Sequence, residues 1–205
     1  MGSILIASAL PIVRLGLRAV LREVKPEAPV QEAGTARQIE DLACADTMLA
    51  IIDPDIPELN PVVLSQHLLR NTPELPILFY GGHNPGLYAS ISMKLGLAGY
   101  LSADADHATI VATIRTILGG MRCLPRQPIG DTSATRLQTL SQKELTVLML
   151  LKQGLRNKDI AEKLYLSEKT ISAHKRNILS KLNIRAIAQL SDTQQEILED
   201  QLALC

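Results

Sequence analysis

Apolar residues in the first half of the chain form short continuous runs that alternate with segments of helical spacing. The run at Met48–Ile52 has no polar alternation, which is typical of a parallel strand buried on both faces. The predicted strands are Ile4–Ala7, Val30–Ala33, Met48–Ile52, Ile77–Tyr80 and Gly99–Leu101. The predicted helices are one that begins at Pro11, then Thr35–Leu42, Pro61–Arg70, Gly86–Leu95 and Ala105–Leu118. Five strand–helix pairs in this order predict a doubly wound α/β domain.

From residue 137 onward the spacing is helical throughout. Ser141 and Glu144 have the spacing of a capping box, and Leu140 and Leu145 are placed for a hydrophobic staple. The helix that follows ends at Gly154. The next predicted helices are Asn157–Tyr165, Glu168–Leu182 and Ile184–Leu190. Asn157 is the expected N-cap of the first of these helices and Ser167 that of the second. Four helices over 137–190 predict a small all-α domain.

The helix Glu168–Leu182 has an apolar face and a polar face. Ile171, Ile178 and Leu182 fall on one stripe, which we expect to face inward. The residues expected to project outward are Lys169, Ser172, Ala173 and Arg176. A helix of this kind, preceded by a shorter helix and a tight turn, suits insertion into the major groove of DNA.

Charge is distributed unevenly, although the formal net charge of the 205 residues is zero. Residues 1–122 have 9 basic and 12 acidic side chains, whereas residues 137–190 have 10 basic and 4 acidic side chains. A basic module between acidic flanks indicates local contact with phosphates, although a solvated basic face would also explain the charge. Residues 123–136 contain prolines and small polar residues and are predicted to be a linker. Residues 191–205 form a tail with helical spacing.

Other classes of protein lack support in the sequence. The cysteines at 44, 123 and 205 are odd in number and far apart, which fits reduced thiols in a cytoplasmic protein. No apolar run approaches the ~20 residues needed to cross a bilayer, so we expect no membrane association. None of the four histidines has the partners of a metal site or a catalytic triad. We therefore expect no enzyme, no metal and no cofactor.

Two parts of the chain resemble a known family. Asp53–Pro57 (DPDIP) resembles the phosphoacceptor loop of response-regulator receiver domains, and Ile4–Leu17 resembles the start of receivers in the NarL/FixJ branch. The residues that match a LuxR-type helix-turn-helix are Leu140, Ser141, Glu144, Gly154, Asn157, Lys158, Ile160, Ala161, Leu164, Ser167, Lys169, Thr170, Ile171, His174, Ile178, Lys181 and Leu182. The resemblance implies a flavodoxin-like (βα)5 receiver followed by a four-helix DNA-binding domain.

The resemblance also implies five functional positions in the receiver, and four of them are replaced. Asp53 matches the phosphoacceptor. Ser8 and Ala9 stand in place of the acidic pair that holds a divalent cation. Tyr80 stands in place of a Ser or Thr, and Ala103 in place of a Lys. We therefore expect a pseudo-receiver in which Asp53 forms an Asx-type turn, and Tyr80 either fills the altered pocket or belongs to the core.

In the DNA-binding domain, the resemblance places the base contacts on Ser172, Ala173 and Arg176. Arg176 can donate two hydrogen bonds to guanine, and Ala173 can contact a thymine methyl group. The side chains expected to contact phosphates are Lys158, Lys169, Thr170, Lys175 and Lys181. His174 either contacts a phosphate or packs against the domain.

These features predict a sequence-specific transcription regulator that binds double-stranded DNA as a homodimer and does not need phosphate on Asp53. Three alternatives stay open. The first is a conventional two-component regulator phosphorylated at Asp53. The second is an adaptor that acts mainly through protein–protein association. It includes a heterodimer with another regulator, because the stretch around Asn84 and Pro85 resembles Rcs-type capsule regulators in outline. The third is small-molecule sensing by the altered crevice.

Overall fold

A computed structural model describes residues 2–124 and 136–189 of the chain. The chain divides into two compact units, Met1–Ile129 and Gly130–Cys205, and each is described by itself. Most of the predicted linker 123–136 and the whole predicted tail 191–205 lie outside the described residues.

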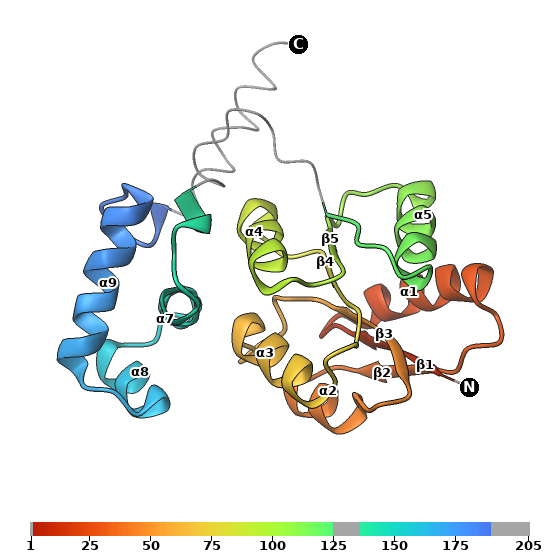
Figure 1. Ribbon diagram of the computed structural model, residues 1–205, viewed down its shortest axis with the longest axis horizontal. Coiled ribbons are helices and arrows are strands. Elements are labelled where there is room, and N and C mark those ends of the chain that lie inside the picture. Colours follow the sequence, from red (N-terminus) through yellow and green to blue (C-terminus); the bar gives the residue numbers. More distant parts are fainter. Residues whose placement is uncertain (1, 125–135, 190–205) are drawn as a thin grey trace, which may run out of the picture. The chain divides into compact units, whose positions relative to one another are not determined.

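The first unit is built on a five-stranded parallel sheet in the order β2-β1-β3-β4-β5 (Figure 1). The strands are β1 (Ser3–Ala7), β2 (Val30–Ala33), β3 (Thr47–Ile52), β4 (Ile77–Tyr80) and β5 (Gly99–Leu101). The helices are α1 (Pro11–Val24), α2 (Ala36–Leu42), α3 (Pro61–Asn71), α4 (Pro85–Leu95) and α5 (His107–Leu118). The doubly wound fold predicted from the sequence is confirmed.

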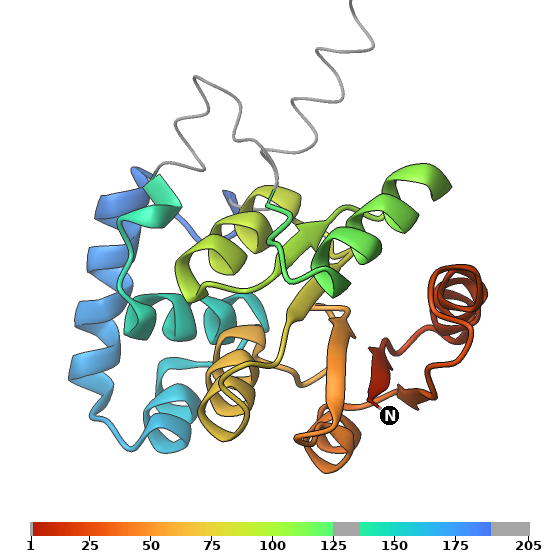
Figure 2. The same ribbon diagram turned by 45° about the vertical axis from the view of Figure 1, so that its right-hand side comes forward.

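Helices cover both faces of this sheet. Helices α1 and α5 lie together on one face, and α2, α3 and α4 cover the other (Figures 1 and 2). The central strand β3 is almost wholly buried, which explains why Met48–Ile52 lacks polar alternation. On the α1 and α5 side, the core is made of aliphatic side chains, among them Ile4, Ile6, Leu17, Leu21, Ile51 and Ile114.

Short polar side chains set where several helices begin. Thr35 caps α2 and Asn60 caps α3, where its Oδ1 accepts from the N–H groups of Val62 and Val63. Asn84 and Asp106 cap α4 and α5 in the same way. Because Asp106 is the cap, α5 starts two residues later than the Ala105 predicted from apolar spacing.

The second unit contains α7 (Gln142–Lys152), α8 (Asn157–Leu164) and α9 (Glu168–Leu182). The capping box is present: the N–H of Glu144 donates to Ser141 Oγ at 3.2 Å, and the N–H of Ser141 donates to Glu144 Oε2 at 2.7 Å. Ser167 caps α9, as predicted. On α9, the predicted inward stripe is confirmed, because Ile171, Ile178 and Leu182 are all buried.

Two local predictions in this unit are wrong. Asn157 does not cap α8; the cap position is Arg156, whose N–H is met by Asp159 Oδ2 at 3.3 Å. The predicted helix Ile184–Leu190 does not begin at Ile184, because residue 184 is irregular and residues 185–188 form bends and turns. Asn183 ends α9 in the left-handed conformation, and the N–H of Ile184 donates back to the carbonyl of Leu179 at 3.1 Å. Helical backbone resumes only at Gln189, the last residue described.

Candidate functional sites: a carboxylate crevice and a basic helix

A crevice of about 510 Å³ lies at the carboxyl ends of the strands of the first unit. The ends of parallel strands meet at one edge of a sheet, and ligand sites of doubly wound folds form there. Asp53 directly follows β3, and its N–H donates to the carbonyl of Ala7 at the end of β1 (2.8 Å). The lining residues are Ala9, Leu10, Val13, Asp53, Asp55, Pro57, Tyr80, Gly81, Gly82, His83 and Ala103.

Both oxygens of the Asp53 carboxylate accept hydrogen bonds from the protein itself. The hydroxyl of Ser8, which is fully buried, donates to Oδ2 at 2.7 Å. The N–H of Asp55 donates to Oδ1 at 2.9 Å, and this contact is the Asx turn expected at this position. The sequence identifies Ser8 only as a replacement for a metal ligand and gives no signal for its contact with Asp53, because the two residues are 45 positions apart.

Asp55 also has its contacts within the protein. Its Oδ2 accepts from the N–H of His83 and lies within hydrogen-bond distance of His83 Nδ1, and its Oδ1 accepts from the hydroxyl of Tyr88. Burial, followed by the hydrogen bond to Asp55, raises the pKa of the Tyr88 phenol far above its usual range. Glu58, the third acidic residue between β3 and α3, does not line the crevice. Among residues 2–124 and 136–189, no group of three or more His, Cys, Asp or Glu side chains is placed to hold a metal ion.

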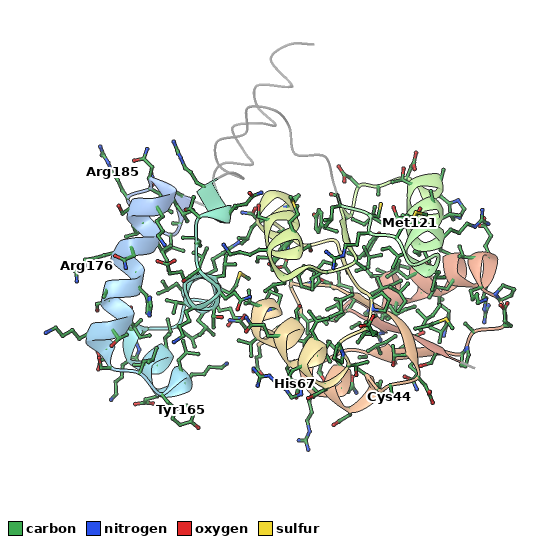
Figure 3. All side chains as sticks on the ribbon, viewed as in Figure 1. Cys44, His67, Met121, Tyr165, Arg176 and Arg185 are labelled. Atoms are coloured by element: carbon green, nitrogen blue, oxygen red, sulfur yellow. The ribbon has the colours of Figure 1, made fainter. Side chains whose placement is uncertain are left out.

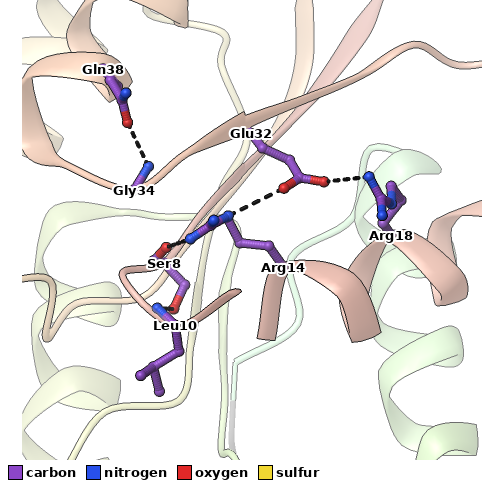
Figure 4. Close-up of polar contacts among 7 residues, drawn as sticks. All are labelled: Ser8, Leu10, Arg14, Arg18, Glu32, Gly34 and Gln38. Carbon is purple, nitrogen blue, oxygen red and sulfur yellow. Dashed lines mark hydrogen bonds and ion pairs between the residues drawn. The ribbon is translucent and has the colours of Figure 1, made fainter. Parts of the chain in front are cut away.

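An ion-pair network fixes the backbone beside Ser8 (Figure 4). The guanidinium of Arg14 donates to the carbonyl of Ser8 at 2.6 Å, and its Nε lies 3.2 Å from Glu32. Arg18 contacts the other oxygen of Glu32 at 3.0 Å. The N–H of Leu10 donates to Ser8 Oγ at 3.2 Å. These contacts hold the serine hydroxyl against Asp53.

The other altered positions line the crevice as well. Tyr80 is half-buried, packs against the core beside α1 and α5, and faces the crevice. Tyr80 is therefore neither a fully buried core residue nor a free surface residue. Burial and the charge of Asp53 raise the pKa of its phenol. Ala9 and Ala103 are exposed at the rim. No Lys or Arg is among the lining residues.

The second site is the outer face of α9. Arg176 is exposed and projects outward (Figure 3). Lys169 is also exposed and lies seven residues earlier on the same face. Ser172 and Ala173 lie between them and are partly exposed. This stripe is opposite the buried one, as the period of a helix requires. Lys158 is exposed on α8, and Thr170, His174 and Lys175 are half-buried on the flanks of α9.

Two of the side chains predicted to contact DNA have partners inside the second unit. Lys181 Nζ lies 2.7 Å from Glu144 Oε2 on α7, so this cation ties the end of α9 to the start of α7. Ser172 Oγ accepts from Asn157 Nδ2 at 3.1 Å, which ties α9 to the start of α8. The sequence contained no local signal for either contact, because both join residues far apart in the chain.

Comparisons with known proteins agree with both units. Residues 138–194 match the family described as bacterial regulatory proteins, luxR family. The chain is 33% identical over 199 residues to Fimbriae Z protein of Salmonella typhimurium, covering 93% of this chain and 95% of the relative. It is 30% identical over 199 residues to the transcriptional activator protein ExaE of Pseudomonas putida, covering 91% and 92%.

Solved structures show the same fold over both units. RcsB of Salmonella enterica serovar Typhimurium, bound to the promoter rprA, has a TM-score of 0.70 at 23% identity, covering 93% of this chain and 96% of that chain. A structure of two RcsB dimers bound to two parallel DNAs has a TM-score of 0.57 at 25% identity, covering 95% and 98%.

A receiver-like α/β unit joined to a helix-turn-helix unit defines a DNA-binding transcription regulator of the response-regulator type. The length and identity of the matches show that the chain belongs to the luxR family of bacterial regulatory proteins. Within the described part of the chain, no helix is long and apolar enough to cross a membrane.

Proposed function

We propose that this chain is a sequence-specific transcription regulator that reads the major groove with α9. The supporting observation is the outward stripe of α9, in which exposed Arg176 lies opposite the buried residues Ile171 and Ile178. Arg176, Ser172 and Ala173 contact base edges. The side chains that contact phosphates are Lys158, Lys169, Thr170 and Lys175. Because Lys181 pairs with Glu144, we assign Lys181 first to holding α9 in place.

We further propose that DNA binding does not depend on phosphorylation of Asp53. The observation that carries this proposal is the crevice itself, in which Asp53 is bonded to Ser8 and no Lys or Arg is present. A phosphoryl group adds about two negative charges near neutral pH. Transfer requires a cation or a metal to offset that charge. Ser8, Ala9 and Ala103 supply neither, so the unit acts as a pseudo-receiver.

The regulator acts as a homodimer in the cytoplasm. The RcsB structure noted above contains dimers on DNA. A dimer places two copies of α9 on two half-sites, which increases both affinity and specificity. The working division is a pseudo-receiver at 1–122, a linker at 123–136, a DNA-binding domain at 137–190 and a tail at 191–205.

Phosphate independence is tested by exposing the full-length protein to acetyl phosphate with Mg²⁺ and measuring its intact mass. A conventional regulator treated in parallel controls for the reagent. No phosphoryl adduct is expected here, because the crevice does not offset the negative charge of the phosphoryl oxygens. A stoichiometric adduct that disappears in Asp53→Ala would contradict the proposal and favour the conventional two-component mechanism.

A further inference from the structure

The crevice of the first unit has the dimensions and the walls of a small-molecule site. Its volume of about 510 Å³ lies within the 300–1,000 Å³ that is usual for such sites. Apolar side chains make up much of the lining, namely Ala9, Leu10, Val13, Pro57 and Ala103. Leu10 is 56% exposed at the mouth, where an apolar ligand would cover it.

Carboxylates dominate the charge inside the crevice, whose one basic lining side chain, His83, contacts Asp55. Asp53 and Asp55 both line it, and no Lys or Arg does. Asp55 is already engaged by His83 and by the hydroxyl of Tyr88. Asp53 has only neutral donors, the Ser8 hydroxyl and the Asp55 N–H, and no ion pair to Asp53 is present among the described residues. An anionic ligand would therefore be repelled, and a cation would find an uncompensated carboxylate.

The tyrosine beside Asp53 reinforces this preference. Tyr80 lines the same crevice, and the charge of Asp53 contributes to the raised pKa of its phenol, so the two groups interact electrostatically. An aromatic ring attracts a cation placed over its face. The carboxylate and the ring together suit an ammonium group, while Leu10 and Val13 provide an apolar wall for the remainder of a ligand.

We propose that this crevice binds a small organic cation, with a protonated amine at Asp53 and Tyr80 and an apolar body against Leu10 and Val13. The inference rests on the proposed phosphate independence, because a phosphoryl group on Asp53 would occupy the same space. Loops that follow β1, β3 and β4 all contribute to the lining. Ala103, which follows β5, adds a fourth loop, so one bound ligand would contact loops from four strands of the unit.

The test uses three ligands of similar shape and different charge on the full-length protein. These are phenethylamine (cationic), 2-phenylethanol (neutral) and 3-phenylpropanoate (anionic). Binding is followed by saturation-transfer difference NMR and by amide shifts in ¹⁵N spectra. We expect millimolar phenethylamine to bind, with shifts at Ala9, Tyr80 and Ala103, and the other two ligands to bind at least about tenfold more weakly. Equal binding of the three ligands, or no binding of phenethylamine, would overturn the proposal.

Variants give a second, independent readout. Asp53→Asn removes the charge, and Ala103→Lys adds a cation at the rim; both should weaken phenethylamine binding by about tenfold or more. Asp41→Asn, at an exposed position on α2, is the matched control and should change nothing. Undiminished binding by Asp53→Asn would overturn the proposal even if the ligand series agreed with it.

The acetyl phosphate experiment separates the two proposals. An adduct on Asp53 means that phosphate independence has failed. No adduct together with no phenethylamine binding means that only the organic-cation site has failed. The ligand series needs no variant, so it stays informative even if Asp53→Asn does not fold.

Discussion

Lys181→Met is expected to destabilise the DNA-binding unit, because it removes the side chain that pairs with the buried carboxylate of Glu144. Glu144 has a side chain only 5% exposed, and its Oε2 accepts from the N–H of Ser141 and from Lys181 Nζ, both at 2.7 Å. Burial raises the pKa of Glu144, but the hydrogen bonds from Lys181 and Ser141 outweigh it, so its pKa lies below the usual value. The pair therefore holds α7 against α9.

The expected magnitude follows from the unequal burial of the two partners. Removing one partner of a fully buried pair costs about 3–5 kcal/mol. Lys181 is 40% exposed, so solvent screens the pair and we expect about 2 kcal/mol for Lys181→Met. Glu144→Gln preserves an acceptor for the N–H of Ser141 and should cost about 1 kcal/mol. The double variant should cost less than the sum of the two, with a coupling energy of about 1 kcal/mol.

Urea unfolding of the full-length protein, followed by circular dichroism, measures these free energies in a double-mutant cycle. Lys163→Met, at an exposed lysine on α8, is the matched control and should change stability by no more than about 0.5 kcal/mol. A coupling energy below about 0.3 kcal/mol would refute the reasoning, because contacting residues that stabilise each other do not act additively.

The same pair predicts a dependence of stability on pH. The pKa of Glu144 is lower in the folded protein than in the unfolded chain, so its stabilisation is fully present above the unfolded value. This stabilisation is lost as the pH falls through the lower pKa that Glu144 has in the folded protein. The difference in stability between wild type and Glu144→Gln should therefore shrink on acidification from neutral pH, and a constant difference would contradict the ionic contribution.

Three further substitutions test other parts of the structure. Tyr165→Gly should raise stability by about 0.5–1 kcal/mol in urea unfolding, because Tyr165 is 96% exposed and has a φ of 55° that suits glycine; a loss would contradict this. Asn60→Ala should cost about 1 kcal/mol, because Asn60 Oδ1 caps α3, and an unchanged urea midpoint would argue against the cap. Arg176→Ala should weaken binding to a specific DNA site by about 1–3 kcal/mol and relax one base preference in gel-shift assays. Arg22→Ala, outside the DNA-binding unit, should do neither.

The spacing of apolar residues and the capping residues predicted the strands and helices closely. The apolar run of β3, the capping box at Ser141 and Glu144, and the bounds of Glu168–Leu182 all depend on residues close together in the chain, and all are present. The local failures have local causes. Asp159 meets the N–H of Arg156, so Asn157 enters α8 and bonds to Ser172. Asn183 ends α9 in the left-handed conformation, although the apolar spacing in the sequence continues beyond it.

The sites were less predictable, because their decisive contacts join distant positions. The sequence alone predicts that Asp53 lies at the end of a strand. It does not predict the hydrogen bond that Ser8 donates to Asp53. The positive charge of Lys181 and its place on α9 predicted a phosphate contact. Only the packing of α7 on α9 shows that Lys181 pairs with Glu144. Likewise, the apolar lining of the crevice combines residues from separate loops.

The most direct test of phosphate-independent DNA recognition is genome-wide mapping of bound sites for the wild type and for Asp53→Ala at equal protein levels. The two maps should agree in both positions and occupancy, and Arg176→Ala should lose the specific sites. Loss of sites in Asp53→Ala, with the protein folded and equally abundant, would contradict the central claim.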